Sequence, residues 1–272
     1  MILLLVDIGN TRVKWARLVA GQMGKQHAAA NAGWDTSDYS RRVIGRGWSG
    51  SSEDRIVVSS VAGKDANGLL TAAAREAGAP VPEFVASERS AAGITTEYLE
   101  PWRLGVDRFV GAIGAHHLAS GQPVCVVNVG TAITIDLVDG TGRHHGGAIV
   151  PGPALMVSSL LTQTNGIRRR ATGGPAGGNG MFARTTRNAI GDGARYAAAA
   201  VIDRAIEESR IRLGSRPLVL LTGGGSADIK PLIRSTSVRL PDLVLHGLAV
   251  WARQTPVPIQ RTHRSRKRRR LD

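Results

Sequence analysis

The sequence predicts an α/β protein of two related halves that face one cleft. Apolar strands alternate with helices along the chain, which is the rhythm of sheets covered by helices. Setting Gly9 over Gly130 aligns VDIGNT with VNVGTA, each between an apolar strand and a second strand. A third apolar strand runs into a glycine triplet at 223–225. Strand–glycine turns are common, so coincidence is an alternative for each match, but three together favour an internal duplication.

The first half is expected to hold strands, helices and one poorly patterned stretch. Residues 2–6 are apolar and end at Asp7, which predicts a buried strand too short to span a membrane. The stretch from 20 to 50 is rich in glycine, alanine and serine, so we expect only short strands and a helix there. The other expected elements are strands at 13–19, 55–61 and 83–86, and helices at 65–77 and 108–119.

The second half is expected to be richer in helix. Residues 124–138 predict two strands around a tight turn. Residues 165–179 are basic and glycine-rich and therefore predict a loop. The other expected elements are strands at 147–150 and 217–222, and helices at 154–161, 186–208 and 243–252.

Size and composition predict a globular cytoplasmic protein. A chain of 272 residues can bury a core without disulfides, and its single cysteine, Cys125, permits no internal one. No secretory or membrane-spanning segment is visible. The net charge is +14, and part of it lies in the tail RTHRSRKRRRLD. That tail could contact nucleic acid, but a solvated, disordered terminus is the simpler interpretation.

The first glycine turn carries side chains that suit a nucleotide phosphate. Asp7 offers a carboxylate for Mg²⁺ or its waters, Gly9 allows close backbone approach, and Thr11 and Lys14 offer a hydroxyl and an ammonium. An ordinary β-hairpin turn, in which Asp7 and Asn10 bond only their own backbone, is the alternative. Neither G-x-x-x-x-G-K-[ST] nor a strand followed by G-x-G-x-x-G occurs. A phosphate site split between two hairpins remains, as in the superfamily of acetate kinase, sugar kinases, heat-shock ATPases and actin.

The ordered series of motifs over residues 1–252 resembles the type III pantothenate kinases, also described through a Bvg accessory factor. DIGNTRVK at 7–14 resembles the family's first phosphate loop, and LGVDR at 104–108, after Tyr98 and Pro101, its substrate and catalytic loop. GTA at 130–132 with Thr134 and Asp136 resembles the second phosphate loop. The remaining matches are Ser59–Val61, GGAIVPG at 146–152, Thr186 with Ala189, Ile190 and Gly193, the glycines at 223–225, and PDLVLHGL at 241–248.

The resemblance implies two actin-like, ribonuclease H-like halves and the phosphorylation of pantothenate by ATP to 4′-phosphopantothenate, the first step of coenzyme A biosynthesis. It implies a homodimer with Mg²⁺ and a monovalent cation, K⁺ or NH₄⁺. Residues 1–120 would be the half with the first phosphate and catalytic loops. Residues 121–258 would be the half with the second phosphate loop and the adenosine site, and 259–272 a basic disordered tail.

The same resemblance assigns the site residues. Asp107 would be the general base that takes the proton of the substrate hydroxyl. ATP and its phosphates would contact Asp7, Ile8, Gly9, Asn10, Thr11, Arg12, Val13, Lys14, Thr131, Gly223 and Gly224, with Asp7 holding Mg²⁺ directly or through water. Pantothenate would contact Tyr98, Gly105, Val106, Asp107 and Arg108, with Arg108 pairing with its carboxylate and Thr186 acting across the dimer interface.

Two features depart from the family pattern. Position 128 is Asn, where many members have the Asp that helps to bind the monovalent cation, so we expect a weaker requirement for K⁺. The tail beyond Pro258 matches nothing expected of the family, and Arg168–Arg170 have no assignable role.

Simpler interpretations exist for several of these residues. Asp107 could be only the N-cap of the helix that follows, and Arg108 could be a solvated helix residue. The pairs at 116–117 and 144–145 are adjacent histidines, which suit surface or loop positions better than a zinc site, and Cys125 suits a core strand. For the whole chain, the alternatives are a regulatory protein that binds nucleic acid through its tail and a hydrolase of polyphosphate or ATP.

Overall fold

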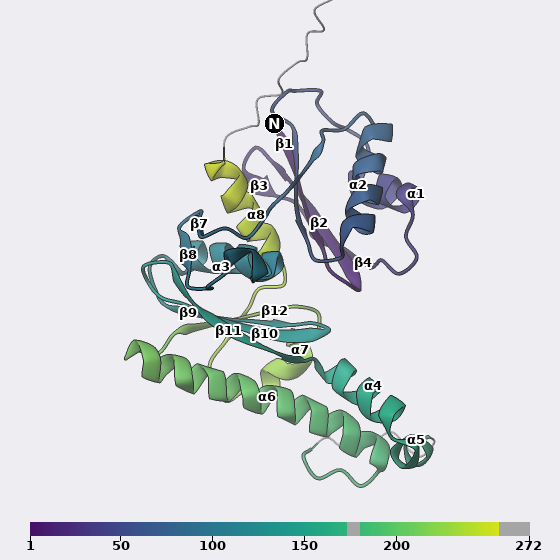
Figure 1. Cartoon of the computed structure of the whole chain (residues 1–272), viewed down its shortest axis with the longest axis vertical. Coiled ribbons are helices and arrows are strands. Elements are labelled where there is room, and N and C mark those ends of the chain that lie inside the picture. Colours follow the sequence, from purple (N-terminus) through teal and green to yellow (C-terminus); the bar gives the residue numbers. More distant parts are fainter. Residues whose placement is uncertain (173–179, 256–272) are drawn as a thin grey trace, which may run out of the picture.

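Two β-sheets with helices between them and on their outer sides form the protein (Figure 1). The computed structural model describes residues 1–172 and 180–255. The expected tail at 259–272 and the glycine-rich part of the expected loop, 173–179, lie outside the described residues. No helix within the described ranges is both long and apolar enough to cross a membrane.

The first sheet is centred on the N-terminal strand. β1 (Ile2–Ile8) is buried from Leu3 to Ile8 because its apolar side chains meet helices or other strands on both faces. The strand order is β3-β2-β1-β5-β6, and β4 also pairs with β2. The strands are β2 (Arg12–Val19), β3 (Gln22–Met23), β4 (His27–Ala30), β5 (Arg55–Ser60) and β6 (Pro82–Phe84).

The second sheet repeats the arrangement of the first. β9 (Val124–Val129) lies between the antiparallel β10 (Ala132–Val138) and the parallel β12 (Leu218–Thr222), as β1 lies between β2 and β5. The order β11-β10-β9-β12-β13 therefore matches β3-β2-β1-β5-β6 and confirms two related α/β halves. The other strands are β11 (Arg143–Pro151), β13 (Val238–Arg239), β7 (Ser90–Ala91) and β8 (Ile94–Thr96).

Two glycine-bearing helices fill the space between the sheets. α3 (Val106–Ala119) supplies Phe109 and Ile113 to the core of the second sheet and Val110 to that of the first. α8 (Leu243–Gln254) packs against α3 and against β1. A Cβ added at Gly247 would overlap the carbonyl of Val110, so this crossing tolerates no side chain there.

The outer faces carry the remaining helices. α2 (Lys64–Glu76), α1 (Thr36–Asp38) and η1 (Tyr39–Ile44) cover the first sheet, with Tyr39 and Leu70 in its core. α6 (Thr186–Leu213) and α7 (Ser226–Ile229) cover the second. α4 (Pro153–Gln163) and α5 (Asn165–Ala171) project beyond it, and η2 (Pro101–Arg103) and η3 (Lys230–Leu232) are single turns.

Two segments depart from expectation, and the domain division is left untested. Residues 165–171 form helix α5 instead of a loop, because the arginines at 168–170 are good helix formers that outweigh Gly166. The histidine pair at 144–145 lies in strand β11, and His144 is 0% exposed, so the surface-loop interpretation is wrong for it. The division at residue 120 stays a prediction: β7 and β8 precede it and join the second sheet, while α8 follows it and packs on β1.

Gly247→Ala is expected to lower the free energy of unfolding by about 1–3 kcal/mol, because its methyl group would force α8 away from α3. Thermal unfolding measures the change. Gly68→Ala in α2 is the matched control: nothing lies within 4 Å of its added Cβ, so it should gain about 0.5–1 kcal/mol. Equal shifts of the same sign in the two variants would contradict the packing argument.

Candidate active site

The turns after β1 and β9 meet at one end of the two sheets. The hydroxyl oxygens of Thr11 and Thr131 lie 3.3 Å apart, although the two residues belong to different halves of the chain. In each turn a glycine N–H donates to a backbone carbonyl oxygen: Gly9 donates to that of Arg12, and Gly130 donates to that of Ala132. The repeated topology therefore brings two glycine turns with threonine hydroxyls face to face, as the sequence alignment predicts.

A cavity of about 760 Å³ opens between these turns, α4 and the start of α7. It is large enough for a nucleotide. Four of the predicted residues, Thr11, Arg12, Thr131 and Gly224, line it. Leu155 and Ile229 give it apolar walls.

Other predicted phosphate residues lie around this cavity without lining it. The side chains of Ile8 and Val13 are fully buried in the core, so only their backbone could meet a ligand. Asn10 is exposed. Gly223 has a φ of +87° and packs against the Val129 backbone, which only glycine allows.

Sequence reasoning missed the wall contributed by α4 and α6. Leu155, Ser158, Gly191 and Arg195 line the cavity but belong to no recognised motif. For the α4 residues the only signal is the proline at 153, which begins the helix directly after the turn at Gly152.

Asp7 is a buried carboxylate at the end of β1. Burial raises the pKa of Asp7 to about 6, the ammonium of Lys14 at 3.6 Å lowers it, and the nearby charge of Asp107 raises it again. The hydroxyl of Ser59, the neighbour of Asp7 in the β1–β5 register, also lowers the pKa of Asp7. The charges of the Asp7 and Asp107 carboxylates thus repel each other, and a cation near both would be stabilised by both.

Asp107 lies in the first turn of α3 and is not its N-cap. The helix begins at Val106 and Gly105 is the cap, so the capping interpretation of Asp107 is wrong. Burial raises the pKa of Asp107, and the backbone N–H and the charge of Arg108 reduce that rise. A Cβ added at Gly105 would come within 2.8 Å of the Asp107 carboxylate, so this glycine keeps the carboxylate accessible.

Arg108 is buried and paired within the protein. Its Nε and Nη2 donate to the two oxygens of Asp136, the shortest bond being 2.6 Å, and its Nη1 donates to the Tyr98 hydroxyl at 2.8 Å. Arg108 is 6% exposed, so the interpretation as a solvated helix residue is wrong. The carboxylate that Arg108 contacts in this structure is that of Asp136.

Thr186 lies far from the other predicted substrate residues of the same chain. It begins α6, whose first turn is capped by the hydroxyl of Thr185 at 3.2 Å from the Asn188 N–H. That end of α6 packs near α5, whereas α3 lies on the opposite side of the second sheet (Figure 1). The chain by itself does not bring Thr186 together with Tyr98 and Asp107.

Asn128 presents a buried oxygen that has no hydrogen-bond partner among the described residues. Thr222, its neighbour in the β9–β12 register, has a buried hydroxyl that likewise has no hydrogen-bond partner among the described residues. An amide and a hydroxyl oxygen suit a monovalent cation as donors but bring no charge. Within residues 1–172 and 180–255, no cluster of three or more His, Cys, Asp or Glu residues could hold a metal ion.

Comparison with known proteins places the chain in one family. Residues 3–208 match the model of the type III pantothenate kinase family. Relatives named type III pantothenate kinase include one from Nitrosococcus oceani, 35% identical over 93% of this chain and 94% of its own length. Another, from Herminiimonas arsenicoxydans, is 37% identical over 93% of this chain and 98% of its own.

Two solved structures share the fold at low sequence identity. A putative Baf family transcriptional activator from Campylobacter jejuni has a TM-score of 0.55 at 17% identity, covering 90% of this chain and 94% of its own. Component A of (R)-2-hydroxyglutaryl-CoA dehydratase from Acidaminococcus fermentans has a TM-score of 0.52 at 12% identity, covering 93% and 97%. The fold is therefore the actin-like α/β fold of two halves.

Asp7→Asn is expected to stabilise the protein at pH 8 and to leave it nearly unchanged at pH 4. The folded state raises the pKa of Asp7, so its contribution to stability is fully present below about pH 3.8 and is lost as the pH rises through about 6. The loss amounts to about 3 kcal/mol of the free energy of unfolding. An asparagine amide does not ionise and therefore avoids this loss. Melting temperatures of both proteins across this range measure the effect.

Asp139→Asn is the opposite-sign control for this experiment. Burial alone would raise the pKa of Asp139, but hydrogen bonds from Thr141 and His145 lower it to about 2. Its contribution is therefore lost as the pH falls, so Asp139→Asn should destabilise the protein at pH 8. A pH-independent difference between Asp7→Asn and the unsubstituted protein would contradict the assignment of a raised pKa.

Proposed function

The chain belongs to the type III pantothenate kinase family, and we propose that it transfers the γ-phosphoryl group of ATP to pantothenate. The product is 4′-phosphopantothenate, and the reaction is the first step of coenzyme A biosynthesis. The observation that carries this proposal is the meeting of two glycine turns at one cavity, with the buried carboxylate of Asp7 beside them and the half-buried carboxylate of Asp107 near Asp7. This combination supplies a phosphate grip, a metal-binding carboxylate and a base.

ATP occupies the cavity of about 760 Å³ in this proposal. The turn N–H groups and the hydroxyls of Thr11 and Thr131 bind phosphate oxygens, with Lys14 and Arg12 adding positive charge. Adenosine lies against Gly224 and the apolar wall formed by Leu155. Asp7 holds Mg²⁺ directly or through water, and that ion, when bound, neutralises charge on the phosphates.

Asp107 acts as the general base in the transfer. It accepts the proton of the pantothenate hydroxyl as the oxygen attacks the γ-phosphorus and the bond to the β-phosphate oxygen breaks. A raised pKa makes its carboxylate a better base, and the backbone N–H and the charge of Arg108 limit that rise. Positioning of the two substrates supplies most of the acceleration.

Pantothenate lies beside Asp107, bounded by Tyr98, Gly105 and Val106. The proposed pairing of Arg108 with the substrate carboxylate needs revision, because Asp136 occupies two of its nitrogens. Arg108 acts instead through Nη1 and the Tyr98 hydroxyl that it contacts. In this proposal the substrate contacts Arg108 only through the Tyr98 hydroxyl.

A homodimer completes this site in the proposal. Thr186 can join Tyr98 and Asp107 only from a second copy, because it lies across the second sheet from them in its own chain. None of the described side chains of α4 is buried, and Phe182 is 95% exposed, so this side of the molecule offers apolar surface for such a contact.

A cytoplasmic location fits the use of ATP.

A monovalent cation, K⁺ or NH₄⁺, binds at Asn128 and Thr222 in this proposal, with less affinity than a carboxylate would give. The alternative of a nucleic-acid-binding regulator depends on residues 261–272, outside the described residues, and nothing among the described residues favours it. A hydrolase of ATP or polyphosphate would release phosphate without pantothenate.

Asp107→Asn is expected to lower kcat at least about 100-fold while leaving the KM for ATP within about twofold, because the amide cannot accept the proton. ATP turnover with and without pantothenate measures this. Asp65→Asn, which also changes an acid in the first turn of a helix, is the matched control and should keep full activity. Turnover that does not depend on pantothenate, or an unchanged rate in Asp107→Asn, would refute the proposed function.

Asn128→Asp is expected to increase the stimulation of the kinase by K⁺, since it restores a charge beside the unpartnered Thr222 hydroxyl. The measurement is the ratio of kcat/KM with K⁺ to that with a large organic cation at equal ionic strength. A strict K⁺ requirement in the unsubstituted enzyme would contradict the expectation drawn from Asn128.

A further inference from the structure

Five residues beside the proposed substrate site form a closed ring of hydrogen bonds. The Tyr98 N–H donates to Thr96 Oγ1 at 3.2 Å, and that hydroxyl bonds His144 Nδ1 at 3.1 Å. His144 Nε2 lies 2.9 Å from Asp136 Oδ1, and Asp136 accepts Arg108 Nη2 at 2.6 Å. Arg108 Nη1 donates to the Tyr98 hydroxyl at 2.8 Å, which closes the ring.

Four of the five residues are almost entirely removed from water, and Tyr98 is partly buried. His144 is 0% exposed, Asp136 and Thr96 are each 2% exposed, and Arg108 is 6% exposed. A buried ion pair is costly unless its remaining hydrogen-bonding groups are satisfied, and His144 provides Asp136 with that extra partner. The ring therefore has one geometry, with little room for water to replace any link.

Donor and acceptor roles follow from the chemistry of each group. Thr96 Oγ1 accepts the Tyr98 N–H, so its own proton goes to His144 Nδ1, the acceptor that the described residues place in reach. His144 then carries its proton on Nε2 and donates it to Asp136. At the other end, Arg108 can only donate, so the Tyr98 oxygen accepts from it. The phenolic proton of Tyr98 must therefore point to another acceptor.

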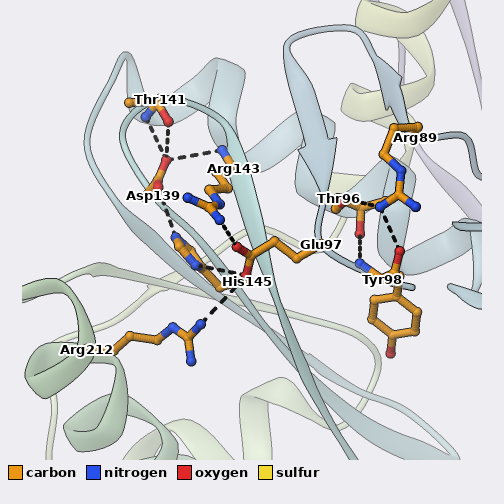
Figure 2. Close-up of polar contacts among 9 residues, drawn as sticks. All are labelled: Arg89, Thr96, Glu97, Tyr98, Asp139, Thr141, Arg143, His145 and Arg212. Carbon is orange, nitrogen blue, oxygen red and sulfur yellow. Dashed lines mark hydrogen bonds and ion pairs between the residues drawn. The ribbon is translucent and has the colours of Figure 1, made fainter. Parts of the chain in front are cut away.

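Tyr98 is fixed at its backbone as well as at its hydroxyl. Arg89 Nη1 donates to the carbonyl oxygens of Thr96 and Tyr98 at 2.8 and 2.7 Å. Figure 2 shows the Tyr98 ring directed away from this anchor, while Glu97 turns toward Arg143 and His145. Thr96 and Tyr98 thus belong to the ring of hydrogen bonds. Glu97, which lies between them in the chain, belongs instead to an outer cluster with Arg143 and His145.

Gly147 leaves room for the ion pair at the centre of the ring. It lies opposite Asp136 in the β10–β11 register. A Cβ at this position would come within 2.7 Å of both Arg108 Nη2 and Asp136 Oδ1. Any other residue at 147 would therefore push the guanidinium and the carboxylate apart.

We infer that Thr96, His144 and Asp136 are positioning residues, which through Arg108 fix Tyr98 and make its hydroxyl a hydrogen-bond donor to an acceptor oxygen of the substrate. The identity of that substrate as pantothenate rests on the proposed function. The acceptor is a carbonyl or carboxylate oxygen, because the Tyr98 oxygen already receives the Arg108 proton. The ring thereby selects substrates that carry such an oxygen at a fixed distance from the hydroxyl that reacts.

The first test removes one link of the ring. Thr96→Val should raise the KM for pantothenate about tenfold, as expected for the loss of a hydrogen bond that positions a binding group, and leave the KM for ATP within about twofold. Thr96→Ser keeps the hydroxyl and should restore most of the loss. His145→Gln, in the outer cluster, should leave both constants unchanged. Equal increases in both KM values, or no rescue by serine, would overturn the inference.

A double-mutant cycle separates positioning of Tyr98 from general loosening of the fold. In the Tyr98→Phe background the hydroxyl is absent, so Thr96→Val should change the KM for pantothenate by less than about twofold. If Thr96→Val has the same effect in both backgrounds, the two residues act independently and the inference is wrong.

A third measurement does not depend on turnover. Nitrogen-15 NMR of the imidazole rings at pH 7, assigned with His144→Gln, should show His144 with its proton on Nε2. A proton on Nδ1 would overturn the order of donors in the ring. If the unsubstituted enzyme failed to phosphorylate pantothenate, the proposed function would be refuted, while this tautomer would still report on the ring.

Discussion

The ion pair between Arg108 and Asp136 is the interaction on which the arrangement of the site depends. Arg108 belongs to α3, which packs between the sheets, and Asp136 belongs to β10 of the second sheet. Their bond fixes the first turn of α3 against that sheet. The preceding residue, Asp107, is thereby held close enough to Asp7 of the first sheet for its charge to add to the burial that raises the pKa of Asp7. Removing either partner would leave a buried charge uncompensated, at a cost of about 3–5 kcal/mol.

The repeated topology explains why a phosphate site forms without a single phosphate-binding loop. In each half, the strand that lies between an antiparallel and a parallel neighbour ends in a glycine turn. The two turns meet at Thr11 and Thr131. Each provides N–H groups and a hydroxyl, so in the proposed function the two turns hold a triphosphate from both sides.

Several polar groups at the candidate site are buried at a cost in stability. Asp7 is buried with a raised pKa, and the oxygens of Asn128 and Thr222 have no hydrogen-bond partner among the described residues. Buried polar groups of this kind normally find partners, so their state points to ligands that supply them. By contrast, the ring through His144 and Thr96 is satisfied within the protein, which suits a role in positioning.

The α/β class, the duplication and the family are visible in the sequence, because apolar periodicity and glycine turns are local signals and the motifs keep their order. The sequence also predicts the glycine turns of Thr11 and Thr131, which the structure brings together. The folded structure was needed to show that Arg108 pairs with Asp136, that His144 is buried and that α4 lines the cavity. These three features depend on contacts between residues distant in sequence. A local sequence pattern does not predict which residue a buried charge pairs with.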